Sequence, residues 1–474
     1  MWKSNEIREV TNGTLQGAAF EASSVTIDSR KLQQGALFVA LKGDRVDGHD
    51  YVKDALARGA VAALVHRVPE GIHPASSLIV VPDTYKALVD MAVAARKRTH
   101  AKIIAVTGSV GKTGTKEAIR TALAGTGSVY ATQGNLNNHI GLPLSLANLP
   151  RESPYGVFEL GMNHAGELSF LTRILRPDIA VITNVEAVHL EFFANVDAIA
   201  DAKAEIMEGM PKDGVIILNR DNRFYDRLLG HAGTHGIKNV ISFGAHEKAQ
   251  CRLIDYALTE FGSQTEANIG GTAITYRLGT MGRHWALTSL AALAAVTAAG
   301  ADLADAAAAL THFHEPDGRG RLHRVALAKG VITLIDDCYN ASPSSMGAGI
   351  AKLAELYAHN GGASRKIVVL GDMLELGVAS VDLHKGLLGI LEQYSIDKLY
   401  AAGPLMKHLY DIVPASMQGA HAKTADLLVD AVSGALQEND IVLIKGSRGS
   451  HMDIVRDALL TLTHHNTKES VDAL

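Results

Sequence analysis

The chain has very little cysteine. Only two cysteines, Cys251 and Cys338, occur in 474 residues. Two cysteines cannot build a disulfide framework or a cysteine-rich zinc site. Their scarcity therefore indicates a protein of a reducing compartment.

Long apolar runs are also missing. The most apolar stretch, from Trp285 to Ala299, is rich in alanine and interrupted by three hydroxyl side chains. A membrane-spanning helix needs about 20 mostly apolar residues, so this stretch predicts a buried helix instead. The first ten residues mix charged and polar side chains and lack an apolar signal core. We therefore expect a cytoplasmic protein without a membrane span.

The chain lacks a strong excess of either charge. Its formal net charge is -5 and its sequence pI is about 6.5. A protein that binds nucleic acid through bulk charge is usually basic, so nucleic acid is not an expected partner.

The length predicts several domains, because single hydrophobic cores rarely grow beyond about 250–300 residues. Short apolar runs rich in β-branched residues alternate with helical patterns, which is typical of parallel α/β sheets. The turn-forming stretch from Glu315 to Arg321 is a candidate linker. We expect three domains, covering residues 1–100, 101–314 and 315–474. Strands are predicted at 36–41, 61–65, 78–81, 102–106, 156–160, 178–183, 215–218, 331–335, 366–370, 398–401 and 441–445, and a helix at 84–98.

The sharpest signal is the run Thr107-Gly-Ser-Val-Gly-Lys-Thr113, which follows an apolar strand. Its glycines let backbone N–H groups face an anion, and the following helix points its positive end at the same place. The loop backbone is formed by Gly108, Ser109, Val110 and Gly111. In such a loop the lysine, Lys112, reaches the β- and γ-phosphates and the hydroxyl of Thr113 binds Mg²⁺. The usual pattern has glycine where this chain has Val106.

A lysine lies on the apolar face of the predicted helix 195–210. At about 100° per residue, Lys203 falls within a stripe that includes Ile199 and Ile206. It can reach solvent with its tip, or pair with a carboxylate. Alternatively, burial lowers its pKa and the neutral amine adds CO₂, giving a carbamate that can bind Mg²⁺.

Other polar residues follow predicted strands. Glu159 ends one strand and His189 follows another. Ligand sites of open parallel sheets lie beyond the carboxyl ends of the strands, so both side chains can converge on the phosphate loop. A carboxylate suits Mg²⁺, whereas a single histidine is more often structural. The run from Gln133 to His139 adds three asparagines in a turn-like segment.

Together these motifs resemble those of the Mur ligases, over nearly the whole chain. The matching phrases are Asp28-Ser-Arg30, Phe38 to Gly43, Asp47-Gly-His49, Thr107 to Thr113, Gly134 to Asn138, Glu159-Leu-Gly161, His189-Leu-Glu191, Ala202 to Ile206, Asp336 to Ala341, Leu370 to Gly377 and Lys445-Gly-Ser-Arg448. The branch that adds meso-diaminopimelate typically has an Asp-Asn-Pro-Arg motif, which is absent. The phrases of the first and last domains resemble the branch that adds D-alanyl-D-alanine.

The resemblance implies an ATP-dependent, amide-forming ligase with a central P-loop-type domain, a small N-terminal domain for the UDP-linked substrate and a Rossmann-like C-terminal domain. Its substrates would be UDP-N-acetylmuramoyl-tripeptide and D-alanyl-D-alanine, joined through an acyl phosphate, and the enzyme would be a monomer. Mg²⁺ would be bound by Thr113 and Glu159, and a second Mg²⁺ by His189 and carbamylated Lys203.

The resemblance also implies roles outside the loop. Asn138 would lie near the transferred phosphate, and Arg321 would reach the ATP phosphates from the third domain. The remaining nucleotide contacts would come from Asp336, Tyr339 and Asn340, with Asp337 as an alternative to Asp336. The UDP-substrate would contact Ser29, Arg30 and Asp47. The dipeptide side would include Lys445, Ser447 and Arg448.

Two motifs depart from the family. Where many members have His-Asn-x-x-Asn, this chain has His284-Trp-Ala-Leu-Thr288, so a usual adenine contact is replaced by Thr288. The third-domain phrase reads Asn340-Ala-Ser-Pro343 instead of Asn-Ala-Asn-Pro. Two other interpretations stay open: a related ligase that adds another amino acid, and a P-loop nucleotide hydrolase that acts as a switch. A guanine-binding Asn-Lys-x-Asp run is absent.

Overall fold

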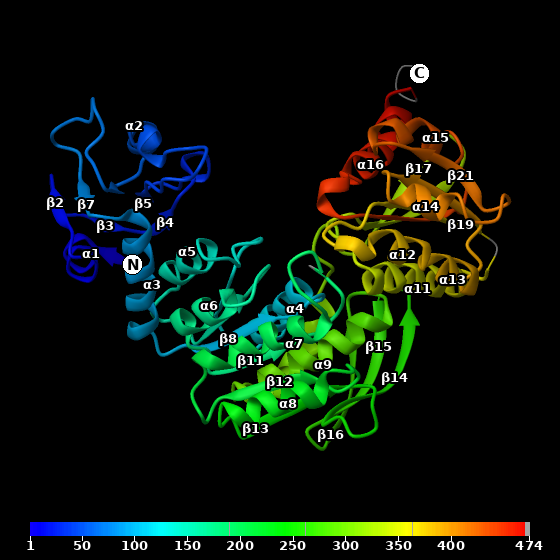
Figure 1. Ribbon diagram of the computed structural model, residues 1–474, viewed down its shortest axis with the longest axis horizontal. Helices are drawn as coiled ribbons and strands as arrows, with labels where there is room; N and C mark the ends of the chain where they lie inside the picture. Colours follow the sequence, from blue (N-terminus) through cyan, green and yellow to red (C-terminus); the bar gives the residue numbers. More distant parts are fainter. Residues whose placement is uncertain (189, 261, 363, 470–474) are drawn as a thin grey trace.

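The protein forms three lobes joined in an arc (Figure 1). The computed structural model describes residues 1–188, 190–260, 262–362 and 364–469, and side chains as far as residue 462. The N-terminal and C-terminal lobes stand at opposite ends of the central lobe in this view. No helix of the described residues is both long enough and apolar enough to span a membrane.

The first lobe contains a five-stranded sheet. Its strand order is β2 (Thr14–Gln16), β7 (Leu78–Val80), β6 (Ala62–Val65), β5 (Ala36–Val39) and β4 (Ser24–Thr26). Only β2 runs antiparallel to its neighbour. The pair β1 (Trp2–Lys3) and β3 (Glu21–Ala22) and the helices α1 (Ser4–Thr11) and α2 (Val52–Ala57) complete the lobe. The predicted helix 84–98 is confirmed as α3 (Thr84–Arg98), capped by Asp83.

The central lobe is built on a nine-stranded sheet. Its order is β16 (Thr272–Leu278), β15 (Gly262–Ile269), β14 (Cys251–Thr259), β13 (Asn239–Gly244), β12 (Val215–Asn219), β11 (Ile179–Ile182), β8 (Lys102–Thr107), β10 (Tyr155–Glu159) and β9 (Val129–Ala131). The predicted strands of this part are confirmed within one or two residues. The antiparallel extension β14 to β16 was not predicted.

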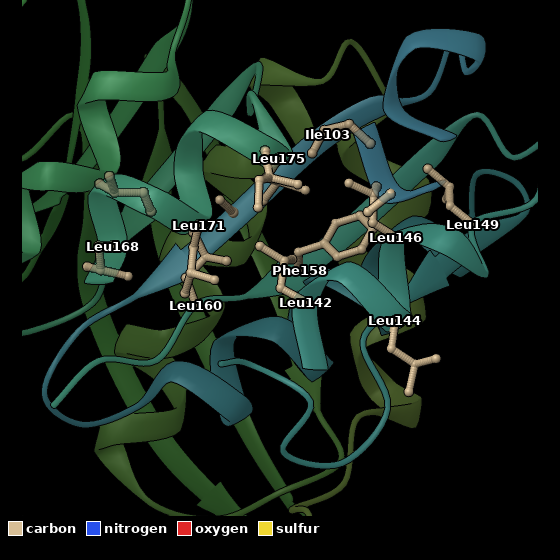
Figure 2. Close-up of a cluster of buried hydrophobic side chains, with 14 of the residues drawn as sticks. Ile103, Leu142, Leu144, Leu146, Leu149, Phe158, Leu160, Leu168, Leu171 and Leu175 are labelled. Atoms are coloured by element: carbon tan, nitrogen blue, oxygen red, sulfur yellow. The ribbon is translucent and has the colours of Figure 1, made fainter. Parts of the chain in front are cut away.

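Helices cover both faces of this sheet. One face packs against α4 (Lys112–Ala124), α9 (Arg283–Ala298) and α10 (Leu303–Ala309). The other face packs against α5 (Gly141–Ala147), α6 (Glu167–Leu175), α7 (Val196–Ala204) and α8 (Tyr225–Thr234). Figure 2 shows leucines of α5 and α6 gathered around Phe158 of β10. This packing holds the strands whose carboxyl ends carry the candidate site.

The first and central lobes share one hydrophobic core. Residues of both, from Trp2 and Leu64 to Leu142 and Phe158, belong to the same buried cluster. Polar contacts reinforce the joint: the indole N–H of Trp2 donates to the carbonyl of Ala147 over 2.7 Å. The two lobes therefore form one packed body.

The third lobe has its own sheet and its own cores. Its strand order is β17 (Arg321–Ala326), β18 (Val331–Asp337), β22 (Ile441–Lys445), β19 (Lys366–Gly371), β20 (Lys398–Ala402) and β21 (Gln418–Ala422), with only β17 antiparallel. Its helices are α11 (Pro343–His359), α12 (Ser380–Lys385), α13 (Leu387–Gln393), α14 (Met406–Tyr410), α15 (Val429–Ser433) and α16 (Asp453–Glu469). The predicted strands are again confirmed, and the mixed α/β, three-domain architecture with them.

A buried ion pair connects the linker to the third lobe. Lys352 of α11 lies 2.7 Å from the carboxylate of Glu315 and donates to the carbonyl of Gly320 over 2.6 Å. The Lys352 and Glu315 side chains are 2% and 8% exposed. The pair therefore anchors both ends of the predicted linker to the first helix of the third lobe.

We expect Lys352→Met to destabilise the third lobe by about 3–5 kcal/mol, because Glu315 is then buried without its partner. The double variant Lys352→Met/Glu315→Leu should recover much of this loss, since it leaves no unpaired charge. Denaturant unfolding, followed together with hydrogen exchange in α11, measures both effects. A double variant no more stable than the single one would mean that the loss comes from the other contacts of Lys352, such as its hydrogen bond to the Gly320 carbonyl, and not from the unpaired carboxylate.

Candidate active site

The phosphate loop lies between the ends of β8 and β11. Gly108 has a φ of +146°, and a Cβ built on it would lie 2.0 Å from Oγ1 of Thr183. Gly111 has a φ of +85° and caps the first turn of α4. Both positions favour glycine. At Gly108 a side chain would collide with Thr183 and the backbone φ is positive, whereas at Gly111 the positive φ alone is the reason. The shape of the loop therefore depends on the neighbouring residue Thr183 as well as on the glycines of the loop itself.

Hydrogen bonds fix this loop to the segment after β11. The Thr183 hydroxyl donates to the carbonyls of Val110 and Thr107. The amide of Ser109 donates to Asn184, and its hydroxyl donates to the carbonyl of Glu186 over 3.2 Å. The segment after β11 thus holds the backbone of the phosphate loop in the conformation that can bind an anion, so the loop is preorganised.

Lys112 begins α4 and curls over the loop. Its Nζ donates to the carbonyl of Gly108 over 2.8 Å and lies 3.4 Å from that of Ser109. Burial lowers the pKa of Lys112, an effect that the negative charge of Glu159 opposes. The ammonium group lies over the loop, at the position where the β- and γ-phosphates of a nucleotide are bound in P-loops.

Thr113 and Glu159 lie together at the carboxyl end of the sheet. The Thr113 hydroxyl donates to one carboxylate oxygen over 2.8 Å, and the side-chain amide of Asn137 donates to the other over 2.8 Å. Glu159 is 2% exposed. A hydroxyl and a carboxylate are oxygen ligands of the kind that Mg²⁺ prefers, with phosphate and water oxygens as the rest of its shell.

One residue of the asparagine run contacts Glu159, and the predicted role of its neighbour Asn138 near the transferred phosphate stays a prediction. The side chain of Asn138 accepts from the amides of Ile140 and Gly141 at the start of α5 and is exposed. Its neighbour Asn137, which the sequence reasoning missed, contacts the carboxylate of Glu159. Adjacent positions of a turn point in different directions, and the sequence alone does not say which one faces the site.

Lys203 lies in α7, where it is 1% exposed. The predicted helix 195–210 changes after Ala204 into a 3₁₀ turn, Glu205–Gly209. Burial, and after it the charge of Lys112, holds the pKa of Lys203 well below its usual range. No carboxylate of the described residues forms an ion pair with it. In the structure, the Lys203 side chain neither reaches solvent nor pairs with a described carboxylate.

His189 lies outside the described residues, and its role stays a prediction. Within them, no group of three or more histidine, cysteine, aspartate and glutamate side chains is arranged to hold a metal ion. A metal at this site would therefore depend on Thr113, Glu159 and the oxygens of its substrate.

In the third lobe, Asp337 and Lys445 form a buried pair. The Nζ of Lys445 lies 2.8 Å from the Asp337 carboxylate and donates to the carbonyl of Asn340 over 2.9 Å. Burial raises the pKa of Asp337, and the Lys445 ammonium opposes that rise. The predicted residues Asn340 and Lys445 are thus brought together at the ends of β18 and β22.

Asp336 faces the opposite side of its strand. Its carboxylate accepts from the amide of Gly318 over 3.2 Å and from Nη1 of Arg456 over 3.4 Å, and it is 3% exposed. These contacts hold the linker against β18. Of the two predicted aspartates, Asp336 is engaged in these structural contacts and Asp337 lies beside Lys445.

Arginines surround the ring of Tyr339. The guanidinium carbon of Arg448 lies 5.8 Å from the ring centre and that of Arg319 lies 4.4 Å from it. The hydroxyl of Ser447 accepts from the amide of Leu374 over 2.9 Å. Arg321, in contrast, is an exposed residue of β17 whose side chain pairs with Asp317.

The predicted substrate residues of the first lobe belong to two separate turns. Arg30 forks onto the carboxylate of Asp28, and this hydrogen bonding lowers the pKa of Asp28 to about 2, while Ser29 between them is buried. Asp47 accepts from Nδ1 of His49 and pairs with Arg67.

A cavity of about 460 Å³ lies where the first and central lobes meet. It is lined by Leu41, Lys42, His66, Pro82, Asp83, Thr84, Tyr85, His139 and Ile140. The hydroxyl of Tyr85 donates to the carbonyl of His139 over 3.2 Å across the joint. The sequence reasoning missed this cavity, because its walls come from segments of different lobes.

The residues that replace the family's asparagines are engaged within the protein. Trp285 packs on the start of α4: a Cβ on Gly114 would lie 2.4 Å from its indole ring. The hydroxyl of Thr288 donates to the carbonyl of His284 over 2.9 Å. Burial lowers the pKa of His284 to about 3, so this imidazole is neutral.

Comparison with known families agrees with this geometry. The Mur ligase family catalytic domain matches residues 21–104, the Mur ligase middle domain residues 106–296, and the Mur ligase glutamate ligase domain residues 320–448. The chain belongs to the Mur ligase family, and it is therefore a ligase.

Individual members of the family that resemble the chain are ligases of one type. It is 35% identical to the UDP-N-acetylmuramoyl-tripeptide--D-alanyl-D-alanine ligase of Rickettsia prowazekii, covering 96% of this chain and 99% of that protein. It is 34% identical to the ligase of the same name from Escherichia coli, covering 96% and 97%. The crystal structure of MurF from Acinetobacter baumannii superposes with a TM-score of 0.82 at 30% identity, covering 97% and 98%. MurF of Thermotoga maritima, solved in complex with ADP, superposes with 0.78 at 26% identity, covering 94% and 98%.

We expect Gly108→Ala to weaken nucleotide binding by at least about tenfold, because the added methyl group meets Thr183 and the backbone is strained. Gly134→Ala is the matched control, since Gly134 also has a positive φ but has no heavy atom within 4 Å of the added Cβ. Calorimetric titration with ADP measures the affinities. Equal affinities of the two variants would contradict the close approach.

Proposed function

We propose that this protein joins D-alanyl-D-alanine to UDP-N-acetylmuramoyl-tripeptide at the cost of ATP, giving the UDP-muramoyl-pentapeptide precursor of peptidoglycan. The observation that carries the proposal is the phosphate loop with Lys112 over it and the Thr113–Glu159 pair beside it, in a chain that matches ligases of this name over nearly its full length. We place the reaction in the cytoplasm, where ATP and UDP-linked precursors occur, and we propose a monomer.

The chemistry follows from the poor reactivity of a carboxylate, whose leaving group would be oxide. Transfer of the γ-phosphoryl group of ATP to the terminal carboxylate of the tripeptide gives an acyl phosphate. The neutral amine of D-alanyl-D-alanine then attacks, and phosphate leaves. Lys112 and the loop amides orient the phosphates and neutralise their charge, which is the main source of rate in phosphoryl transfer.

Thr113 and Glu159 are the proposed protein ligands of one Mg²⁺, which would neutralise phosphate charge when bound. We propose that Lys203 is carbamylated and, with His189, takes part in a second site. Its burial and its lowered pKa support this, because only a neutral amine adds CO₂.

We assign the remaining predicted residues to the two substrates. The turn with Ser29 and Arg30 and the turn with Asp47 would bind the UDP-substrate, together with the cavity beside Tyr85. Tyr339, Asn340 and Asp337 would lie at the nucleotide, and the β22 end with Lys445, Ser447 and Arg448 at the dipeptide. Asn138 and Arg321 stay predictions from the family resemblance. Through its product, the protein would serve cell-wall synthesis and so cell shape and division.

The proposed function predicts phosphate release from ATP that requires both UDP-muramoyl-tripeptide and D-alanyl-D-alanine, with an equal amount of pentapeptide product. The measurement is phosphate release with each substrate omitted in turn, and mass analysis of the product. Release that needs neither substrate would favour a nucleotide hydrolase. Release with another amine would keep the family and change the substrate.

The carbamate proposal predicts that Lys203→Ala loses ligase activity by at least about 100-fold and regains part of it with added short-chain carboxylic acids, whose carboxylate replaces the carbamate. Lys116→Ala is a comparison variant, because Lys116 is an equally buried lysine whose Nζ donates to the carbonyl of Thr132 away from the loop. Its activity should not respond to carboxylic acids. Full activity of Lys203→Ala without additives would refute the carbamate.

A further inference from the structure

His164 presents a free imidazole nitrogen in the loop between β10 and α6. Its Nδ1 lies 3.2 Å from Oε1 of Glu167, and the imidazole is 57% exposed. Its Nε2 has no hydrogen-bond partner within the described residues. A carboxylate at Nδ1 fixes the ring and favours the tautomer whose proton is on Nδ1, which leaves a lone pair on Nε2. The His164 side chain is therefore arranged as a proton acceptor that a small molecule can reach.

The Glu167 carboxylate is held as an anion by the same loop. Its Oε2 accepts from the amide of Asn163 over 2.7 Å and lies 3.3 Å from the amide nitrogen of His164. Burial alone raises the pKa of Glu167, but the hydrogen bonds from Asn163 and His164 outweigh burial and lower the pKa below its usual value. A fixed negative charge beside Nδ1 stabilises an imidazolium once the ring has accepted a proton.

Contacts within the central lobe place this loop at the candidate active site. It follows β10, the strand that ends in Glu159. On its other side, the carboxylate of Glu205 accepts from the amide of Gly166 over 2.7 Å, and Glu205 begins the turn after the helix that carries Lys203. The loop with His164 is therefore fixed between the strand end at Glu159 and the helix end at Lys203.

The imidazole also lies beside the contact between the central and third lobes. Its ring centre is 4.7 Å from that of Phe192, a residue of the segment after β11. The preceding residue, Glu191, meets the third lobe: its amide nitrogen is 3.5 Å from the carbonyl oxygen of Glu375, and its Cα would lie 3.4 Å from a Cβ built on Gly377. His164 is thus one residue away from an interlobe contact.

The third-lobe loop at this contact continues to the proposed dipeptide side. The amide of Leu374 donates to the hydroxyl of Ser447, at the end of β22, over 2.9 Å. A chain of direct contacts therefore runs from Ser447 through Leu374 and the segment after β11 to His164. An amine held by the third lobe and a carboxyl group activated at the phosphate loop would meet in this region.

The charged groups on the elements around His164 are mainly carboxylates. They are Glu167 on α6, Glu205 after α7, Glu191 after β11 and Glu375 in the third lobe, and the cation among them is Lys203. Burial and the charge of Lys112 lower the pKa of Lys203, and Glu205 and Glu167 oppose that effect. Negative surroundings attract an ammonium group and stabilise a protonated imidazole.

Other histidine–carboxylate pairs lack this arrangement. His49 pairs with Asp47, but its side chain is fully buried and its Nε2 accepts a backbone N–H over 3.0 Å. His231 uses Nε2 itself for the carboxylate of Asp201, between α8 and α7. Among these histidines, His164 is the one that keeps Nε2 free at the sheet edge with the phosphate loop.

We infer that His164 accepts the proton that the amine of D-alanyl-D-alanine must lose before it attacks, with Glu167 holding the imidazole in place. The inference rests on the proposed function, because it concerns the amine of that reaction. An α-amine is mostly an ammonium group near neutral pH, and an ammonium group has no lone pair for attack. A base at the site removes this barrier.

The transfer accounts for each proton and electron pair. One proton moves from the ammonium group to Nε2 of His164, giving an imidazolium beside the Glu167 carboxylate. The freed lone pair forms the bond to the acyl carbon, and the bond from that carbon to the phosphate oxygen breaks. The second amine proton leaves with the phosphate as hydrogen phosphate, and the imidazolium returns its proton to water.

The experiment compares His164→Gln with His231→Gln, the matched control, because His231 also pairs with a carboxylate over 2.8 Å. The kcat/KM for D-alanyl-D-alanine is measured against pH at saturating ATP and UDP-muramoyl-tripeptide. His164→Gln should lower it at least about 100-fold near neutral pH, and the remaining rate should rise with pH until the amine loses its proton unaided. The control should follow the wild-type profile. Glu167→Gln should cause a smaller loss, because it removes the anion beside Nδ1 and keeps the base.

Hydroxylamine separates a catalytic role from a structural one, because it is uncharged near neutral pH and needs no base. In place of the dipeptide it traps the acyl phosphate as a hydroxamate, and His164→Gln should form this product at the wild-type rate. Equal losses of hydroxamate and pentapeptide in His164→Gln would overturn the inference, and so would a wild-type pH profile in that variant. A wild-type protein that forms neither product would instead refute the proposed function and, with it, the reaction in which His164 acts.

Discussion

The close approach of the phosphate loop to the end of β11 is the constraint on which the rest of the site depends. Gly108 passes so near to Thr183 that no side chain fits between them, and the Thr183 hydroxyl binds the loop from below. β8 lies between β10 and β11, so the same sheet edge also presents Glu159 next to Thr113. A sheet in another strand order would leave the lysine, hydroxyl and carboxylate apart.

The distribution of hydrophobic cores explains how three substrates can meet. The first and central lobes share a core and cannot separate without exposing apolar surface. The third lobe has separate cores and meets the linker through the polar contacts of Lys352, Glu315 and Asp336. Movement about this joint would disturb the packing of Met281 on the third-lobe core but would leave the shared core of the other two lobes intact, so the third lobe is the one suited to close over a bound nucleotide.

The sequence predicted what depends on local pattern. The phosphate loop, the helix 84–98 and most parallel strands follow from apolar runs and glycine spacing, and Lys203 stood out because it breaks an apolar stripe. Other features depend on partners far along the chain. Whether Asn137 or Asn138 faces Glu159, and whether Asp336 or Asp337 meets Lys445, depends on the direction of one side chain in the folded state. The ion pair of Lys352 with Glu315 and the cavity beside Tyr85 join separate segments and leave no local pattern.

The environment of Lys203 links fold to chemistry. A protonated Lys203 is disfavoured by two effects: its charge loses hydration on burial, and the Lys112 ammonium repels it. No described carboxylate pairs with it to offset these effects. Loss of the proton removes the repulsion. The proposed addition of CO₂ would go further, because it would place a negative charge where the Lys112 ammonium attracts it. A residue that is unfavourable as a cation would thus be favourable as a carbamate anion, which is a physical reason for a lysine at this buried position under the proposed chemistry.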